Sequence, residues 1–143
     1  MTVAMILSSK GHNVTSVGVG DSLTKAVGEL TARKIGAVVV CDGNQRVLGI
    51  LSERDIVRAL AAFGAAALDN PVEQHMTTKV ITCGEAATVD ECMSAMTDGR
   101  FRHMPVVENE KLVGIISIGD IVKVKIAAAV EEAEAMRNYI AAG

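Results

Sequence analysis

The chain contains the stretch Leu48-Gly49-Ile50-Leu51-Ser52-Glu53-Arg54-Asp55-Ile56-Val57, and it repeats this stretch as Val113-Gly114-Ile115-Ile116-Ser117-Ile118-Gly119-Asp120-Ile121-Val122. Equivalent residues, such as Asp55 and Asp120, are 65 positions apart. A repeat of this length corresponds to one supersecondary unit per copy, and such a unit normally buries its apolar face against its neighbour. The sequence therefore predicts two similar halves with a functional cleft between them.

The length and composition indicate one domain of two lobes. The 143 residues are enough to bury a single core, and half of them are apolar. Only 2% are aromatic and none is Trp, so the core must consist mainly of Val, Ile, Leu, Ala and Met. We predict a first motif in residues 1–69, which includes the N-terminal segment, and a second in residues 70–143, which includes the C-terminal helix.

Charge and hydropathy argue against several classes of partner. The formal net charge of −3 gives no general attraction to nucleic acid or to an anionic membrane surface. No apolar stretch reaches the roughly 20 residues that a bilayer span requires. Residues 1–11 are too short and too polar a segment for a signal peptide. We therefore expect a cytoplasmic protein.

The cysteines and histidines do not indicate a disulfide framework or a metal site. Cys41, Cys83 and Cys92 are odd in number and form no close C-x-x-C pair. A redox role is disfavoured because the sequence shows no cationic neighbourhood beside them. His12 and His75 have no further ligands at metal spacing, so we expect no metal.

Hydrophobic periodicity predicts the same element order, β-α-β-β-α, in both halves. In the first half we expect strands at residues 14–17, 37–41 and 47–51, helices at 23–30 and 52–60, and an Asp-Gly turn at 42–45. In the second half we expect strands at 80–83, 104–107 and 112–116, and helices at 88–97 and from 117. Residues 71–76 predict a short helical bridge, and the Ala- and Glu-rich stretch 122–142 extends the last helix as a candidate oligomer contact.

The candidate functional residues lie where a strand ends and a helix begins in each copy, and they allow two interpretations. Ser52 and Ser117 end their strands, and Asp55 and Asp120 follow three residues later. Ser-x-x-Asp is close to a capping box, in which both side chains only satisfy backbone N–H groups. The same helix start also offers N–H donors and a positive dipole end to a phosphate, while a carboxylate suits a ribose diol. The glycine three residues before each serine lets a ring or a backbone approach the strand.

Both copies carry Gly-x-x-Ser-x-x-Asp, and the second also carries Phe101-Arg102-His103-Met104-Pro105-Val106-Val107. On these residues nearly the whole chain resembles the paired CBS modules, also called Bateman modules, and it is most similar to small stand-alone bacterial CBS-pair proteins. The resemblance implies an α/β (α+β) fold of tandem β-α-β-β-α repeats, packed as a pseudo-two-fold pair whose short sheets face each other with helices outside. It also implies adenosine-containing ligands, such as AMP, ADP, ATP or NAD, in the clefts, and pairing of two modules into a disc-shaped dimer.

The resemblance assigns roles to residues at matching positions. Asp55 and Asp120 match the ribose-binding Asp, and Ser52 and Ser117 match the phosphate-contacting Ser or Thr. The predicted second-copy site contains Thr82, Arg102, His103, Met104, Pro105, Ser117 and Asp120, and the predicted first-copy site contains Ser16, Gly36, Ala37, Ser52, Arg54 and Asp55. We expect the second-copy site to be the stronger, because it offers cationic groups to phosphate and an apolar wall to a base. Arg54 and Arg102 could equally be surface residues, His103 a structural histidine, and Met104 and Pro105 strand packing.

The resemblance implies a regulatory module that binds an adenine nucleotide, senses cellular energy or redox state and modulates a partner protein. AMP is the first ligand expected, with ATP or NAD(H) as alternatives, and the module is expected to be a homodimer. An interaction or redox-partner protein that acts without bound nucleotide is the alternative. An enzyme is disfavoured: similar modules occur inside IMP dehydrogenase, but this chain has no room for the roughly 200 residues or more of a catalytic (β/α)8 barrel. No nucleophile and base are visible as a pair.

Overall fold

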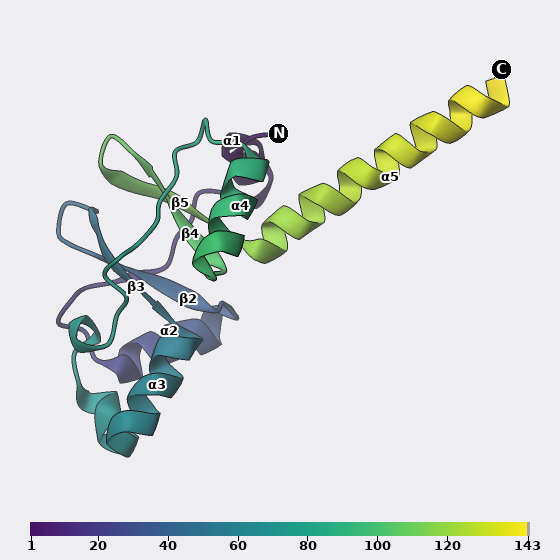
Figure 1. The fold of residues 1–143 in the computed structure, drawn as a ribbon. Helices are drawn as coiled ribbons and strands as arrows, with labels where there is room; N and C mark the ends of the chain where they lie inside the picture. Colours follow the sequence, from purple (N-terminus) through teal and green to yellow (C-terminus); the bar gives the residue numbers. More distant parts are fainter. Residues whose placement is uncertain (143) are drawn as a thin grey trace.

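The computed structural model describes residues 1–142, and its element order follows the repeat (Figure 1). The first half contains β1 (Ser16–Val17), α2 (Leu23–Arg33), β2 (Ala37–Cys41), β3 (Val47–Ser52) and α3 (Glu53–Phe63). The second half contains α4 (Val89–Gly99), β4 (His103–Glu108), β5 (Lys111–Ser117) and α5 (Ile118–Ala142). Helix α1 (Val3–Lys10) precedes both halves, and two 3-10 helices, η1 (Gly64–Asp69) and η2 (Val72–Gln74), connect them.

Each half has its own short sheet. β1 lies parallel to β2, which pairs antiparallel with β3, and β4 pairs antiparallel with β5. The two hairpins have equivalent registers, because Ala37 is opposite Ser52 in one and His103 is opposite Ser117 in the other. Both sheets lie in the middle of the body, with α2 and α3 near the first and α1 and α4 near the second (Figure 1). The predicted tandem α/β fold with short sheets is confirmed.

Local sequence explains where the helices before each hairpin begin and end. Ser22 caps α2 by accepting a hydrogen bond from the backbone N–H of Lys25, and Thr88 caps α4 in the same way. Each helix ends at a residue in the left-handed conformation, Lys34 with φ 55° and Arg100 with φ 57°. These equivalent caps turn the chain into β2 in the first half and into β4 in the second half.

Two apolar clusters hold the two halves. The first joins α2 and α3 to their sheet, and the second joins α4 and α5 to theirs. The second cluster also contains Val3 and Leu7 of α1, which are fully buried there. The backbone N–H of Val3 donates to the carbonyl of Ala87 at 2.9 Å. The first helix of the chain therefore packs into the second half. The sequence predicted neither this helix nor its contact. The boundary between the two motifs at residues 69 and 70 stays a prediction.

The glycine three residues before each capping serine makes room for a side chain of this same chain. A Cβ atom at Gly114 would lie 2.8 Å from both terminal carbons of Leu7. A Cβ atom at Gly49 would lie 2.9 Å from Cγ of Met76. Both distances are too short for a real Cβ contact, so a larger residue would push away the segment that enters each half.

The strand expected at residues 80–83 is wrong. The segment after η2 first meets one sheet and then the other: Thr77 forms a bridge with Ile50, and Cys83 forms a parallel bridge with Val106. Because it crosses between the halves, it has no continuous neighbouring strand to pair with. The strand expected at 14–17 is reduced to β1, whereas the helical bridge at 71–76 is confirmed as the single turn η2.

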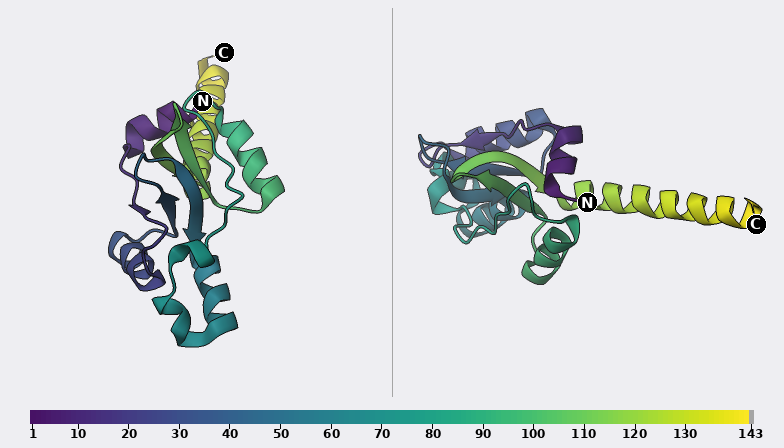
Figure 2. Two further views of the ribbon diagram at one scale, coloured as in Figure 1. Left: turned by 90° about the vertical axis from the view of Figure 1, so that its left-hand side faces the viewer. Right: turned by 90° about the horizontal axis from the view of Figure 1, so that it is seen from above.

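Helix α5 leaves the body and continues as a straight rod (Figure 2, right). Its 25 residues correspond to a length of about 38 Å, and Ile121, near its start, is its buried residue. The predicted extension of the last helix is therefore confirmed. Neither α5 nor any other helix within residues 1–142 combines the length and apolar character needed to cross a membrane.

Candidate functional site

Both Ser-x-x-Asp pairs form capping boxes at the starts of α3 and α5. The carboxylate of Asp55 accepts from the backbone N–H of Ser52 at 2.9 Å, and the Ser52 hydroxyl accepts from the N–H of Asp55 at 3.3 Å. Ser117 and Asp120 make the same two bonds at 2.8 and 3.2 Å. The capping interpretation is therefore confirmed. Any ligand must bind to atoms that these capping hydrogen bonds do not use.

Asp55 is the one buried charged side chain within residues 1–142, with 8% of its surface exposed. Besides the bonds of the capping box, its Oδ1 atom accepts from the hydroxyl of Thr77 at 3.2 Å. Thr77 belongs to the segment that crosses between the halves. A buried carboxylate needs such donors because desolvation disfavours its charge. A sugar hydroxyl that reached Oδ1 could take the place of this threonine hydroxyl.

Asp55 lies at the wall of a cavity of about 810 Å3, which we call the Asp55 cleft. Residues from both halves and from the crossing segment line it: Gly36, Ile50, Ser52, Glu53, Arg54, Asp55, Val57, Arg58, Thr77, Lys79, Val80, Ile81, Gly99, Arg100, Phe101, Arg102 and His103. Ligand sites for small molecules and cofactors occupy roughly 300–1,000 Å3. The cleft is therefore large enough for a nucleotide.

Positive charge is concentrated in the Asp55 cleft although the whole chain is acidic. Its five cationic side chains are Arg54, Arg58, Lys79, Arg100 and Arg102, and its acids are Glu53 and Asp55. None of the five cations forms an ion pair with another residue in the described part of the chain. A group of cations without partners next to a capped helix start suits an anion with several charged oxygens.

An apolar wall accompanies these charges. Val57 and Ile81 are 64% and 49% exposed, and both line the Asp55 cleft together with Ile50 and Val80. Aliphatic side chains of this kind stack against flat heterocyclic rings by dispersion and by removal of apolar surface from water. One cleft thus combines a buried carboxylate, a cationic rim and an apolar face.

The Asp55 cleft brings together residues that the sequence assigned to two sites. Four of the first-copy residues line it, namely Gly36, Ser52, Arg54 and Asp55, together with Arg102 and His103 of the second-copy set. Ala37, Met104 and Pro105 are buried in strands, and Ser16 and Thr82 are exposed outside this cleft. Three of its cations, Arg58, Lys79 and Arg100, were not predicted.

Asp120 has a different neighbour from Asp55. The ammonium group of Lys10, at the end of α1, donates to Oδ2 of Asp120 at 2.7 Å and to the carbonyl of Ile115 at 2.9 Å. Burial opposes ionisation of Asp120, but the hydrogen bonds from Lys10 and from the backbone of Ser117 outweigh it and hold the pKa of this carboxyl below its ordinary value. Lys10 was missed because α1 itself was not predicted.

His103 lies between these two acidic sites. A Cβ atom at Gly36 would lie 3.2 Å from Cε1 of His103, so the ring packs against the backbone of the other half. Burial, assisted by the charges of Lys10 and Arg102, lowers the pKa of His103, although Glu53 and Asp120 act in the opposite direction. The ring is therefore neutral near pH 7 and has one nitrogen that can accept a hydrogen bond.

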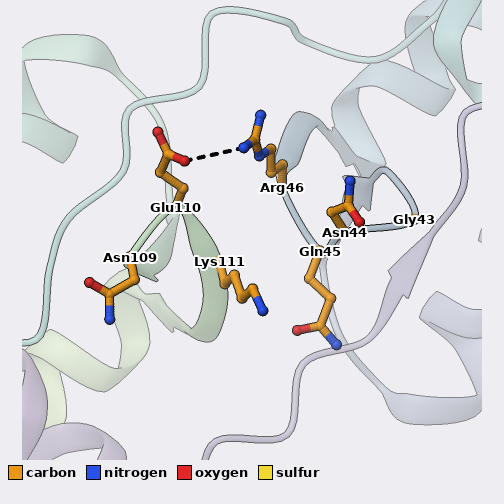
Figure 3. Close-up of a pocket in the computed structure, with 7 residues that line it drawn as sticks. All are labelled: Gly43, Asn44, Gln45, Arg46, Asn109, Glu110 and Lys111. Carbon is orange, nitrogen blue, oxygen red and sulfur yellow. Dashed lines mark hydrogen bonds and ion pairs between the residues drawn. The ribbon is translucent and has the colours of Figure 1, made fainter.

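A second cavity, of about 480 Å3, lies between the tips of the two hairpins (Figure 3). Arg46 and Glu110 form an ion pair across it at 3.2 Å, and the N–H of Leu112 donates to the carbonyl of Gln45 at 3.0 Å. These contacts join the halves at the end away from the helix starts. The lining contains no helix start and no aliphatic side chain, so this cavity does not suit a nucleoside.

The cysteines and the acidic residues give no sign of redox or metal chemistry within residues 1–142. The three cysteines are unpaired, and burial raises the pKa of the Cys83 thiol to about 12. Burial also raises the pKa of Cys41 and of Cys92. No cluster of three or more His, Cys, Asp or Glu could hold a metal ion in this part of the chain.

Comparison with known proteins agrees with this architecture. The CBS domain model matches residues 7–62 and 72–127. A mitochondrial CBS domain-containing protein of Arabidopsis thaliana is 33% identical over 99% of this chain and 73% of its own length. The crystal structure of a CBS-domain containing protein from Agrobacterium tumefaciens has a TM-score of 0.84 and 50% identity, covering 87% of this chain and 99% of its own.

Several solved relatives contain adenosine-based ligands. A CBS domain protein from Pyrobaculum aerophilum complexed with AMP has a TM-score of 0.75 and 28% identity, covering 84% of this chain and 89% of its own. The repeated motif, the tandem fold and these matches lead to one assignment. The chain belongs to the CBS-domain family and carries a pair of CBS domains.

Proposed function

We propose that this CBS pair is a regulatory module that binds an adenine nucleotide in the Asp55 cleft and thereby modulates a partner protein. The observation that carries the proposal is the combination, in one cavity of about 810 Å3, of a buried carboxylate and five cations without ion-pair partners. A related CBS domain protein was solved with AMP, which supports the same ligand class here. The regulatory role and the partner follow from the family resemblance.

The three parts of a nucleotide have separate counterparts in the Asp55 cleft. Oδ1 of Asp55 accepts from the ribose diol in place of the Thr77 hydroxyl. The cations around Arg58 and Arg102 bind the phosphate, and the aliphatic wall at Ile81 contacts the base. We propose AMP as the first ligand, and the number of cations makes ATP and NAD(H) the alternatives.

We propose the Asp55 cleft, in place of the second-copy site at Asp120, as the stronger of the two sites. The sequence favoured the second copy because it carries Arg102 and His103, but both of these side chains line the Asp55 cleft. Asp120 is already bonded to Lys10. We propose that the Asp55 cleft fills first and that ligand binding at Ser117 and Asp120 requires Lys10 to move from the carboxylate to a phosphate.

Titration of purified protein with AMP, ADP, ATP, NAD, NADH and S-adenosylmethionine, followed by calorimetry and by thermal unfolding, tests the proposal. A ligand that binds only the folded state raises the unfolding midpoint by mass action. We expect Asp55→Ala to weaken binding by about 1–3 kcal/mol, the scale of a hydrogen bond to a charged group. Asp55→Asn keeps one acceptor oxygen, and Asp98→Asn changes an exposed acid of α4 as the matched control.

A second comparison separates the phosphate from the nucleoside. Arg102→Gln should weaken AMP and leave adenosine unchanged, whereas Asp55→Ala should weaken both. Unchanged AMP affinity in folded Asp55→Ala protein would exclude the ribose role. No response of the wild-type protein to any of the six ligands, after a check that no nucleotide co-purified, would exclude the proposed ligand class.

An interaction protein that acts without nucleotide is the second candidate. The exposed apolar side chains of α5 favour it, because such a surface normally marks a contact with another protein. We propose a regulatory and not a catalytic role in both cases, in a homodimeric protein. The cytoplasmic location stays a prediction.

A further inference from the structure

Helix α5 exposes a row of large apolar side chains that the folded body does not cover. Val122, Ile126, Met136 and Ile140 are 48%, 59%, 60% and 72% exposed. The CBS domain match ends at residue 127, whereas the helix continues to Ala142. Residues 128–142 therefore extend beyond the matched CBS pair, and the four exposed apolar side chains named above have no partner within residues 1–142.

The exposed row has the spacing of a coiled-coil seam. It consists of Val122, Ile126, Ala129, Ala133, Met136 and Ile140, which alternate steps of four and three residues. This is the a and d pattern of a heptad repeat, with positions d at 122, 129 and 136 and positions a at 126, 133 and 140. Polar residues lie on the opposite face, as Glu131, Glu134 and Asn138 show.

The body contacts a different face of α5, so the seam stays accessible. Ile121 is fully buried in the second core, and Val124 is partly buried against the same cluster. Lys125 forms an ion pair with Asp90 of α4. These residues are one helical face, and they fix the direction in which the seam points.

We propose that α5 pairs with α5 of a second copy of this chain in a parallel two-stranded coiled coil. Charge selects this arrangement. In the heptad above, Glu132 occupies a g position and Arg137 occupies the next e position, and these two positions face each other between parallel helices. Two copies would therefore form two Glu132–Arg137 ion pairs beside the seam. This inference rests on the homodimer of the proposed function and names the surface that forms it, and it requires no nucleotide.

An antiparallel pair of the same seam would be opposed by charge. When the six seam positions of the two copies are aligned antiparallel, Glu132 lies beside Glu132 of the second copy. Lys123 then lies beside Arg137 of the second copy. Like charges in these flanking positions are unfavourable. The seam is shorter than three heptads and two of its layers are alanine, so we expect a dimer that dissociates on dilution.

Sedimentation velocity or light scattering of the full chain over a concentration series tests this pairing. We expect a dimer, and Ile126→Asp or Ile140→Asp should each raise its dissociation constant by at least about ten-fold, because each buries an unpaired charge in the seam. Ala127→Asp and Ala141→Asp place the same charge one residue further on, outside the seam, and should change the constant by less than about two-fold.

Charge reversal tests the direction of pairing. Glu132→Lys and Arg137→Glu should each raise the dissociation constant by about three-fold, and the double variant should restore it. Tighter association of Arg137→Glu would indicate antiparallel helices and overturn the proposal. A wild-type monomer at all concentrations, or a dimer that survives Ile126→Asp and Ile140→Asp in folded protein, would also overturn it. Nucleotide affinity measured on the same variants distinguishes a failure of the α5 pairing from a failure of nucleotide binding in the Asp55 cleft.

Discussion

Replacement of Lys10 by methionine should uncouple α1 from the start of α5. The lost interactions are the ion pair with Asp120 at 2.7 Å and the hydrogen bond to the carbonyl of Ile115 at 2.9 Å. The side chains of Lys10 and Asp120 are 36% and 23% exposed, so solvent screens part of the attraction. Exposed pairs contribute about 0.2–1 kcal/mol and hydrogen bonds to buried charged groups about 1.5–3 kcal/mol, which places this partly buried pair near 1 kcal/mol.

A double-mutant cycle of Lys10→Met and Asp120→Asn, followed by urea unfolding, measures this coupling. The pKa of Asp120 is lowered in the folded protein, so its contribution is complete above the ordinary carboxyl value of about 3.9 and is lost as the pH falls through the folded value. We expect a coupling free energy between Lys10 and Asp120 of about 1 kcal/mol at pH 7 and at pH 5, and a smaller one at pH 3. Lys25→Met breaks a more exposed pair with Asp21 and serves as the control. A coupling near zero at pH 7, or one that grows as the pH falls, would refute the reasoning.

A variant and a labelling experiment test the packing. Gly114→Ala places a methyl group 2.8 Å from Leu7 and should lower the free energy of unfolding, measured in urea, by about 1–3 kcal/mol. The control Gly28→Ala has open space on an exposed face of α2 and should raise the free energy of unfolding by about 0.4–1 kcal/mol, so equal effects of the two variants would contradict the role of Gly114. Burial raises the pKa of the Cys83 thiol to about 12, so its alkylation by iodoacetamide at pH 8 should be slow in folded protein and fast in urea. Rapid labelling of Cys83 in the native chain would contradict a buried thiol.

Most of the fold could be predicted because its signals are local and occur twice. The hairpins follow from β-rich runs joined by turn residues, and the helix starts follow from Ser52 and Ser117 with an acid three residues later. Helix α1 has no such signal. Its apolar residues, such as Val3 and Leu7, make a pattern of only a few positions, and the core that receives them lies more than 80 residues further along the chain.

The candidate site was predicted in part for a related reason. Ser52 and Asp55 belong to the repeated motif, so the repeat itself pointed to them. Lys79 lies in a segment that forms no regular strand, and Arg100 is a left-handed helix cap, a position that resembles any surface turn in the sequence. Both residues reach the Asp55 cleft only because the crossing segment and the end of α4 meet between the halves.

The repeat makes the two halves alike, and the segments that enter them make the two acidic sites different. The chain that enters from η2 brings a neutral hydroxyl, that of Thr77, to Asp55. The chain that enters from α1 brings the ammonium group of Lys10 to Asp120. A sugar hydroxyl can replace a threonine hydroxyl at little cost, because one neutral donor is exchanged for another. To replace the ammonium group it must first break a charge-assisted hydrogen bond, which is stronger. We therefore expect the two acidic sites, which are built from one motif, to differ in how readily they accept the same ligand, and we attribute the difference to residues outside the motif.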